Sequence, residues 1–242
     1  MCLQAFNIWI LIKSIKFGYY KIEICKCLFA RHFYDRMYEK WGKLNHINQE
    51  ATHKMKKLVL VTSPPACGKT FISRKLAKAL TNCVYLDKDT LIVLSKQIFK
   101  VAGEEYNRSS DFFQREIRDY EYYAVLDIAF EALEYNDTVL INAPFTDEIR
   151  DNEYLDNLRA KLKEKDAELF VVWVHTDIEV CHQRMIKRAS DRDAWKLANW
   201  DEYIATQNFQ KPDNIPELFV FNNSSEEDYK KSIDDAVKAI RS

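Results

Sequence analysis

Gly68, Lys69 and Thr70 are the residues whose types and spacing point most directly to chemistry. They follow an apolar run and open an amphipathic segment, which predicts a loop between a buried strand and a helix. Backbone N–H groups at a helix start bind anions, a lysine reaches the outer phosphates of a nucleotide, and a threonine hydroxyl holds magnesium. Gly68 permits backbone conformations that a side chain obstructs. A chance Gly-Lys-Thr is the alternative, and the strand and helix around it favour a nucleotide-phosphate loop.

Asp87 and Asp89 follow a second apolar run, at residues 83–86. While the chain stays extended, side chains two positions apart share a face, so these carboxylates would point together. In an open α/β sheet the ligand crevice lies at the carboxyl ends of the strands, where this pair falls. The alternative is structural: Asp89 could cap a helix that begins at Thr90.

Arg184, Arg188 and Arg192 recur at intervals of four after another apolar run. A phosphoryl group in transfer spreads negative charge over its oxygens, and a planar, permanently charged guanidinium stabilises that charge. The alternative is a solvated helix face in which Arg188 pairs with Asp191, and Arg192 lies beside Asp193.

Three further arginines, Arg108, Arg115 and Arg118, carry fixed positive charges. Acidic residues alternate with them, among them Glu116 and Asp119. That alternation favours ordinary surface salt bridges over an acceptor site.

These residues need a scaffold, and the apolar pattern from Met55 onward predicts one. Amphipathic stretches lie between the apolar runs, and Ser224 with Glu227 forms a capping box for the last of them. Strands alternating with helices of this length predict a parallel sheet covered on both faces, with right-handed crossovers. The expected strands are residues 58–62, 83–86, 138–142, 169–175 and 218–221, and the clearest helical patterns are 113–128 and 229–240.

The segment Ser63-Pro-Pro-Ala-Cys-Gly-Lys-Thr70 resembles the G-P-P-G-S-G-K-T loop of small P-loop kinases, with serine for the first glycine, alanine for the second and cysteine for the usual serine. The nearest groups are kinase-like AAA-family ATP-binding proteins, zeta-toxin-like kinases, and shikimate and gluconate kinases. The resemblance extends over residues 55–242. It implies an α/β fold of the P-loop NTPase type, a three-layer sandwich with a five-stranded parallel sheet of order 2-3-1-4-5 and an arginine-bearing lid.

The resemblance also implies roles. It places the region of Arg108, Arg115 and Arg118 on the acceptor side, which makes these arginines candidates for holding an anionic acceptor. Asp87-Lys-Asp89 is similar to the D-x-D of shikimate kinases, so we expect Asp89 to act as the base on the acceptor side and Asp87 to contact magnesium indirectly. Where many P-loop proteins carry an aspartate after the third strand, this chain has Asn142. The expected ATP-binding residues are Pro65, Ala66, Cys67, Gly68, Lys69 and Thr70; the expected Mg²⁺ residues are Thr70 and Asp87; and the expected catalytic residues are Lys69, Asp89, Arg188 and Arg192.

Composition bounds the class of protein. The 242 residues include 47% hydrophobic and 30% charged residues, an ordinary globular mixture. Residues 1–54 carry 9 basic and 4 acidic groups, a net +5, and the other 27 basic and 33 acidic groups give the body −6. An acidic body disfavours nucleic acid as a partner. Six cysteines are too few for a disulfide scaffold, which indicates a reducing cytoplasm.

We expect the ATP-binding domain to span residues 55–242. Residues 1–12 are apolar but too short to cross a bilayer, and no positive residue precedes them as in a signal peptide, so no integral span is expected. The favoured interpretation of residues 1–54 is an extension outside the fold, with natural translation starting at Met55. An accessory helix and a membrane-surface anchor are the alternatives.

The sequence therefore favours a magnesium-dependent kinase that transfers the γ-phosphoryl group of ATP to a hydroxyl of a small molecule. Two alternatives stay open: a kinase of nucleic-acid 5′ ends or nucleotide sugars, and a non-catalytic ATP-sensing module. The sequence specifies neither the acceptor nor the oligomeric state.

Overall fold

The computed structural model describes residues 55–190, 193–213 and 215–242. The predictions made for residues 1–54, for Arg192 and for Asp191 lie outside the described residues.

Five strands form one parallel sheet in the order β2-β3-β1-β4-β5, which confirms the predicted fold class. The strands begin or end slightly beyond the predicted runs because polar residues also pair in the ladder; Lys56, for example, lies opposite Ala167. Buried Lys57 donates to the carbonyl of Ala239 at 3.4 Å and pairs with Glu168 Oε1 at 3.1 Å, so its ammonium group has partners. The strands are β1 (Lys56–Thr62), β2 (Cys83–Asp87), β3 (Thr138–Asn142), β4 (Ala167–His175) and β5 (Leu218–Asn222).

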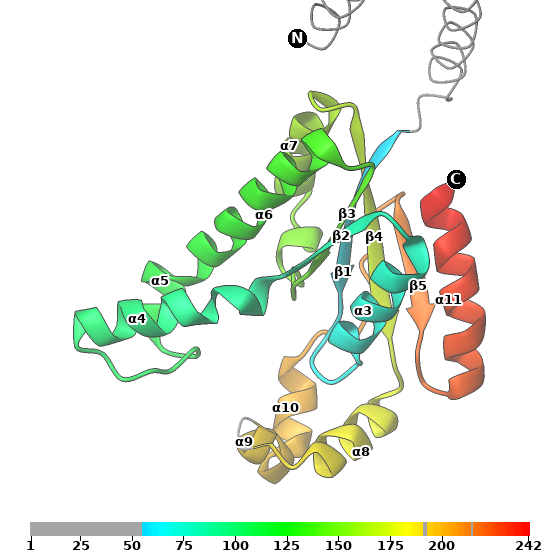
Figure 1. The fold of residues 1–242 in the computed structure, drawn as a ribbon. Coiled ribbons are helices and arrows are strands. Elements are labelled where there is room, and N and C mark those ends of the chain that lie inside the picture. Colours follow the sequence, from blue (N-terminus) through cyan, green and yellow to red (C-terminus); the bar gives the residue numbers. More distant parts are fainter. Residues whose placement is uncertain (1–54, 191–192, 214) are drawn as a thin grey trace, which may run out of the picture. The chain divides into compact units, whose positions relative to one another are not determined.

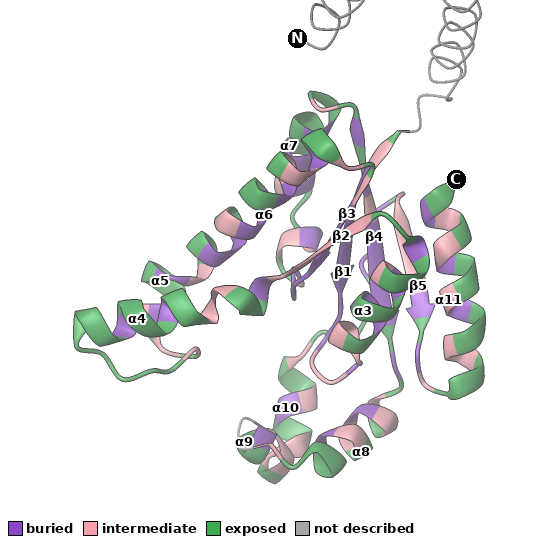
Figure 2. Cartoon of the chain, in the orientation of Figure 1, coloured by how far each residue is buried: buried purple, intermediate pink, exposed green. Residues whose placement is uncertain are grey.

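Helices cover both faces of the sheet (Figure 1). On one face α3 (Lys69–Leu80) and α11 (Glu226–Arg241) pack on alternate residues of the strands, such as Val59 and Val61. On the other face α6 (Arg118–Tyr135) and α7 (Asn152–Lys163) pack on the intervening residues. Figure 2 shows the buried positions along the central strands and on the sheet-facing sides of these helices.

The remaining elements lie between the strands and sheet-covering helices. The elements η1 (Lys88–Leu91), α4 (Ile92–Ala102) and α5 (Asp111–Glu116) follow β2, η2 (Glu148–Arg150) follows β3, and α8 (Ile178–Arg188), α9 (Ala194–Ala198) and α10 (Trp200–Thr206) follow β4.

Two local predictions were wrong. The helical pattern at 113–128 is not one helix, because the backbone breaks at Ile117, where φ is −130°. The break rotates the buried face, so α6 buries Val125 and Ala129 while Tyr120 is 64% exposed. The capping box of α11 lies one residue later than predicted: Ser225 and Asp228 form it.

A buried polar cluster ties the segment after β2 to α6. Both oxygens of Glu121 accept hydrogen bonds: from Lys88 at 2.5 Å, from Ser95 at 2.5 Å, and from Arg108 at 2.8 Å to each oxygen. Burial alone would raise the pKa of Glu121, but the bonds from Arg108, Lys88 and Ser95 outweigh it and lower that pKa to about 2. Lys88 stands between Asp87 and Asp89, so this cluster anchors the carboxylate turn.

We expect Glu121→Gln to lower the free energy of unfolding by about 3 to 5 kcal/mol, because it removes one partner of a buried ion pair and leaves Lys88 uncompensated. The low pKa makes this contribution present above about pH 4.5 and lost as the pH falls toward 2. Urea unfolding at neutral pH measures the loss. Glu116→Gln, which breaks the exposed pair with Arg115, is the matched control and should change stability by less than about 1 kcal/mol.

Candidate active site

The loop between β1 and α3 leaves the first turn of α3 open to an anion. Among the described residues no side chain caps this helix, and its first turn carries no acidic residue. The N-terminal N–H groups and the helix dipole therefore remain available for a phosphate. Gly68 precedes the helix with φ of 89°, in the left-handed region that favours glycine.

Three side chains from other elements fix the backbone of the loop at Cys67. The Cys67 carbonyl accepts hydrogen bonds from Thr176 Oγ1 at 2.9 Å, from Asn223 Nδ2 at 2.8 Å and, longer, from Arg184 Nη1 at 3.5 Å. Because a peptide unit is planar and trans, its N–H points opposite to its carbonyl, so the Gly68 N–H is turned away from these three donors. A Cβ at Gly68 would stand 2.6 Å from Asn223 Nδ2, a second reason why glycine is needed.

The loop accommodates its departures from the family pattern. Ser63 does not adopt a positive φ, and its buried hydroxyl donates to the Pro64 carbonyl at 2.8 Å. Ala66 occupies the second glycine position with φ of 64°. A left-handed alanine is strained by about 1 to 2 kcal/mol, which the braced loop tolerates.

Lys69 is the first residue of α3, and its side chain is connected to Thr70 through Asn142. Its ammonium donates to Asn142 Oδ1 at 2.8 Å, and the Asn142 amide in turn donates to Thr70 Oγ1 at 3.3 Å. Burial lowers the pKa of Lys69 to about 8, against the opposing attraction of Asp89 and Asp87. Asn142 thus joins the lysine and the threonine, a role that its sequence position did not reveal.

We expect the affinity for ATP to fall as the pH rises through about 8 in the free protein, because Lys69 then loses the proton that gives it its charge. Folding lowers the pKa of Lys69, so the unfolded chain binds more protons than the folded chain between about pH 8 and 10.5. The free energy of unfolding therefore increases with pH in that range, whereas the affinity for ATP decreases. Calorimetric titration with Mg·ATP from pH 6.5 to 9.5 measures the affinity. Lys69→Met should bind weakly and show no step near pH 8; an identical step in that variant would contradict the assignment.

Asp87 and Asp89 open on the cleft that faces Lys69. Asp87, not Asp89, is the capping residue: its Oδ1 accepts from the Asp89 backbone N–H at 3.1 Å, which begins η1. Its Oδ2 accepts from the Tyr85 hydroxyl at 2.9 Å. The capping alternative is therefore wrong for Asp89, whose exposed carboxylate is left facing the cleft.

The cleft itself has a volume of about 950 Å³ and runs from the loop to the segment after β4. Walls of both charge signs surround it. Sequence reasoning missed Arg74, Arg150, Lys196 and Asn208, because none lies in a recognisable motif. The lining residues include Ser63, Pro65, Ala66, Gly68, Lys69, Thr70, Arg74, Asp87, Asp89, Pro144, Asp147, Arg150, Arg188, Asp193, Lys196 and Asn208.

The two described arginines of the segment after β4, Arg184 and Arg188, occupy different positions. Arg188 lines the cleft, and its Nε donates to Oδ2 of fully buried Asp193 at 2.8 Å, a partner other than the predicted Asp191. Arg184, one turn earlier, instead donates to the Asn223 carbonyl at 2.7 Å and braces the loop.

The candidate acceptor arginines are occupied elsewhere. Arg108 is held by Glu121, Arg115 pairs with Glu116 at 2.6 Å, and Arg118 pairs with Glu148 at 2.6 Å. The prediction of a surface salt bridge is confirmed for Arg115, whereas Arg108 and Arg118 pair with carboxylates that are largely buried.

The aromatic and histidine residues after β4 include both packed and exposed groups. His182 stacks on Trp200 with ring centroids 4.0 Å apart. Trp195 is 55% exposed. The side chain of His175 is about half exposed, with Nε2 3.7 Å from Asp177 Oδ1.

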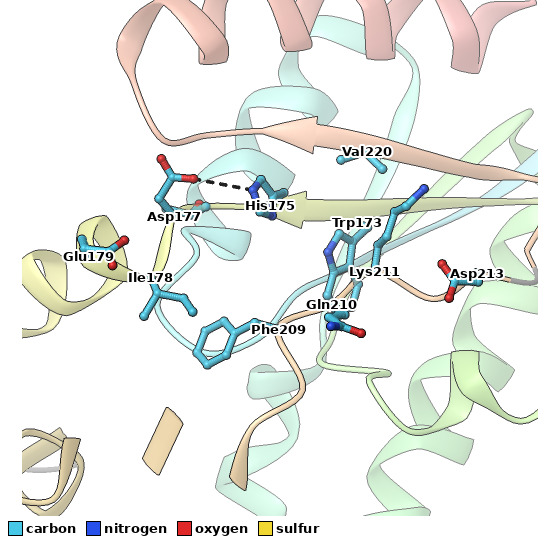
Figure 3. Close-up of a pocket in the computed structure, with 11 residues that line it drawn as sticks. Trp173, His175, Asp177, Ile178, Glu179, Phe209, Gln210, Lys211, Asp213 and Val220 are labelled. Atoms are coloured by element: carbon cyan, nitrogen blue, oxygen red, sulfur yellow. Dashed lines mark ion pairs between the residues drawn. The ribbon is translucent and has the colours of Figure 1, made fainter. Parts of the chain in front are cut away.

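A second pocket, of about 690 Å³, lies beside the carboxyl ends of β4 and β5 (Figure 3). Trp173, Phe209 and Val220 give it apolar walls, and Lys211 and His175 add polar groups. None of the predicted site residues lines it, so the larger cleft is the candidate active site.

The cleft offers Mg²⁺ a few protein oxygens rather than a complete set of protein ligands. Among the described residues no three His, Cys, Asp or Glu side chains gather as a metal cage. Mg²⁺ characteristically keeps several waters and binds through one or two protein oxygens together with substrate phosphates. Thr70 and Asp87 supply oxygens of that kind at the cleft.

A parallel sheet of order 2-3-1-4-5, with a Gly-Lys-Thr loop between its first strand and first covering helix, defines a P-loop protein of the kinase-like class. A family profile described as AAA domain matches residues 58–210, and the chain belongs to that family. A search of curated protein sequences found no match.

Comparison with solved structures finds one protein with the same fold and others that are less similar. A protein of Chloroflexus aurantiacus, provisionally described as a kinase, is 18% identical with a TM-score of 0.54, covering 77% of this chain and 97% of that one. A gluconokinase of Sinorhizobium meliloti is 15% identical with a TM-score of 0.47 (77% and 92% covered). Kti12 of Chaetomium thermophilum, in complex with ADP-AlF3, is 18% identical with a TM-score of 0.47 (76% and 100%). In the described part of the chain no helix is long and apolar enough to span a membrane.

Proposed function

We propose that this protein is a kinase that transfers the γ-phosphoryl group of ATP, with Mg²⁺, to a hydroxyl of a small molecule. The observation that carries the proposal is the shared cleft: Lys69, Asp89 and Arg188 come from three separate elements and line one cavity. Burial lowers the pKa of Lys69, and the negative charges of Asp89 and Asp87 oppose part of that decrease, so both carboxylates lie near the lysine. A phosphate cradle with a facing carboxylate is the arrangement that phosphoryl transfer to a hydroxyl requires.

In this proposal each group acts by charge or by position. The open start of α3 and Lys69 bind the outer phosphates. Asp89 accepts the proton of the acceptor hydroxyl, and Arg188 stabilises the negative charge that develops on the transferring group. Thr70 would hold Mg²⁺, with Asp87 acting through water, and the ion would supply positive charge that neutralises the phosphates.

The walls of the cleft favour a polar, small acceptor over a nucleic acid. Five basic residues line it together with four acidic ones, so its charge is mixed and does not form a purely basic track for a phosphate backbone. The basic residues are Lys69, Arg74, Arg150, Arg188 and Lys196, and the acidic residues are Asp87, Asp89, Asp147 and Asp193. The acidic body adds to this preference.

An ADP-release screen of the full chain tests the proposal. Mg·ATP is offered with sugars, nucleosides, hydroxy acids, antibiotics or a short RNA with a 5′-hydroxyl, and mass spectrometry identifies the phosphorylated product. Lys69→Ala is the control, and it should abolish both release and product. Phosphorylation of the RNA alone would favour the 5′-end kinase. ATP binding with no transfer to any acceptor would refute the kinase and favour an ATP-sensing module.

A further inference from the structure

Two buried thiols connect the phosphate loop to α8. The Sγ atoms of Cys67 and Cys181 lie 3.6 Å apart, and both residues are reduced and almost fully buried. We propose that Cys67 and Cys181 are a covalent modification site, where a reversible disulfide switches off nucleotide binding. The switch rests on the proposed function, because it acts on the same loop.

The geometry requires only a small movement. A disulfide places its sulfur atoms about 2.05 Å apart, so the two Sγ atoms must approach by roughly 1.5 Å. Cys67 lies in a loop without regular structure, whereas Cys181 lies in α8. The loop is therefore the part that we expect to move.

The two thiols have different reactivities. The pKa of Cys67 is raised, because of its hydrogen bond with Cys181 and its burial. The pKa of Cys181 is lowered by that same hydrogen bond and, to a lesser degree, by Arg184. Since the thiolate is the form that reacts with oxidants, Cys181 is the nucleophile and Cys67 is the resolving thiol.

Hydrogen peroxide is the oxidant of suitable size. The Cys181 thiolate attacks one peroxide oxygen, the O–O bond breaks, and hydroxide leaves, giving a sulfenic acid. The Cys67 sulfur loses its proton and attacks the Cys181 sulfur; the S–S bond forms and the S–O bond breaks. The two thiol protons convert the two hydroxides released into water, so two thiols and one peroxide give one disulfide and two waters. Pro65, Ala66 and Gly68 line the cleft, so a local opening of the loop admits the oxidant.

The modification would disturb the site in two ways. The Cys67 carbonyl is held by Thr176, Asn223 and Arg184, and pulling Cys67 toward α8 breaks that bracing and turns the N–H groups that face the phosphates. The bond also ties the loop to the helix that carries Arg188. A displacement of about 1 Å costs as much as roughly 10²-fold where geometry is critical.

Peroxide treatment of the full reduced chain tests the switch. Peptide mapping by mass spectrometry should find a Cys67–Cys181 cross-link, and calorimetry should show ATP affinity at least tenfold weaker, restored by dithiothreitol. Cys83→Ser, which removes the half-buried thiol of β2, is the matched control and should respond as the wild type does. Cys181→Ser should bind ATP within about twofold of the wild type and lose the response to peroxide. If that variant does not fold, Cys181→Ala replaces it.

The possible failures are distinguishable. No cross-link in a chain that binds ATP, or a cross-link that leaves ATP affinity unchanged, would overturn the switch and leave the proposed function standing. A reduced chain that does not bind ATP would refute the proposed function and the switch together.

Discussion

Arg188→Ala is expected to lower turnover by roughly 10³- to 10⁵-fold, the range for a guanidinium that stabilises a transferring phosphoryl group. ATP affinity should change much less, because such a charge acts mainly on the transition state. Arg188 fits this role because its Nε and Nη2 both bind Asp193 Oδ2, at 2.8 and 2.5 Å, which orients the guanidinium at the cleft.

Lys187→Ala is the matched control for this variant. Lys187 is an exposed neighbour on the same helix and does not line the cleft, so its loss removes one positive charge without touching the site. Rapid-quench measurement of the transfer step, beside calorimetric ATP binding, separates the two effects. Equal loss of turnover in both variants would show that Arg188 acts only through the overall positive charge of α8 and not through a specific contact with the transferring group.

The fold was predictable because its signals are local. Five apolar runs alternate with amphipathic stretches, and each run became a strand of the sheet. The phosphate loop was equally predictable, since a strand, Gly68-Lys69-Thr70 and a helix follow one another along the chain. Asp87 and Asp89 were placed at the correct end of β2 by the same reasoning.

What the sequence did not reveal depends on contacts between distant residues. Asn223 and Thr176 brace Cys67 from 156 and 109 positions away, and nothing in their own neighbourhoods signals that contact. Asn142 was interpreted only as a missing aspartate, although its amide joins Lys69 to Thr70.

The wrong helix at 113–128 has the same kind of origin. A regular spacing of apolar residues predicts one buried face, but the break at Ile117 separates α5 from α6 and turns that face. The cluster around Glu121 then determines which side of α6 is inside, because a buried carboxylate must meet its hydrogen-bond donors. A pattern that counts only apolar residues cannot register a glutamate as part of the core.

Asp89→Asn is the second variant for which we expect a large effect: turnover lower by roughly 10²- to 10⁴-fold, the usual contribution of a general base. ATP binding at pH 6.5, where Lys69 keeps its proton, should be nearly unchanged, because the exposed Asp89 carboxylate accepts no hydrogen bond from another described side chain or backbone group. The asparagine keeps the size of the side chain and removes its ability to take a proton, so the loss reports proton transfer.

Two further variants decide whether the effect belongs to Asp89 alone. Asp147→Asn removes an equal charge from the same cleft, from a carboxylate whose closest cation, Arg118, lies 3.7 Å away, and should leave turnover within a few-fold of the wild type. Asp87→Asn should raise the Mg²⁺ concentration needed for half-maximal turnover, because Asp87 is the proposed indirect partner of Mg²⁺; this residue also caps η1. Once the screen has supplied an acceptor, turnover is measured against pH and Mg²⁺ concentration. Near-normal turnover in Asp89→Asn, with the loss in Asp87→Asn instead, would assign the base to Asp87, because both carboxylates line the same cleft and the Asp89 backbone N–H donates to Asp87 Oδ1.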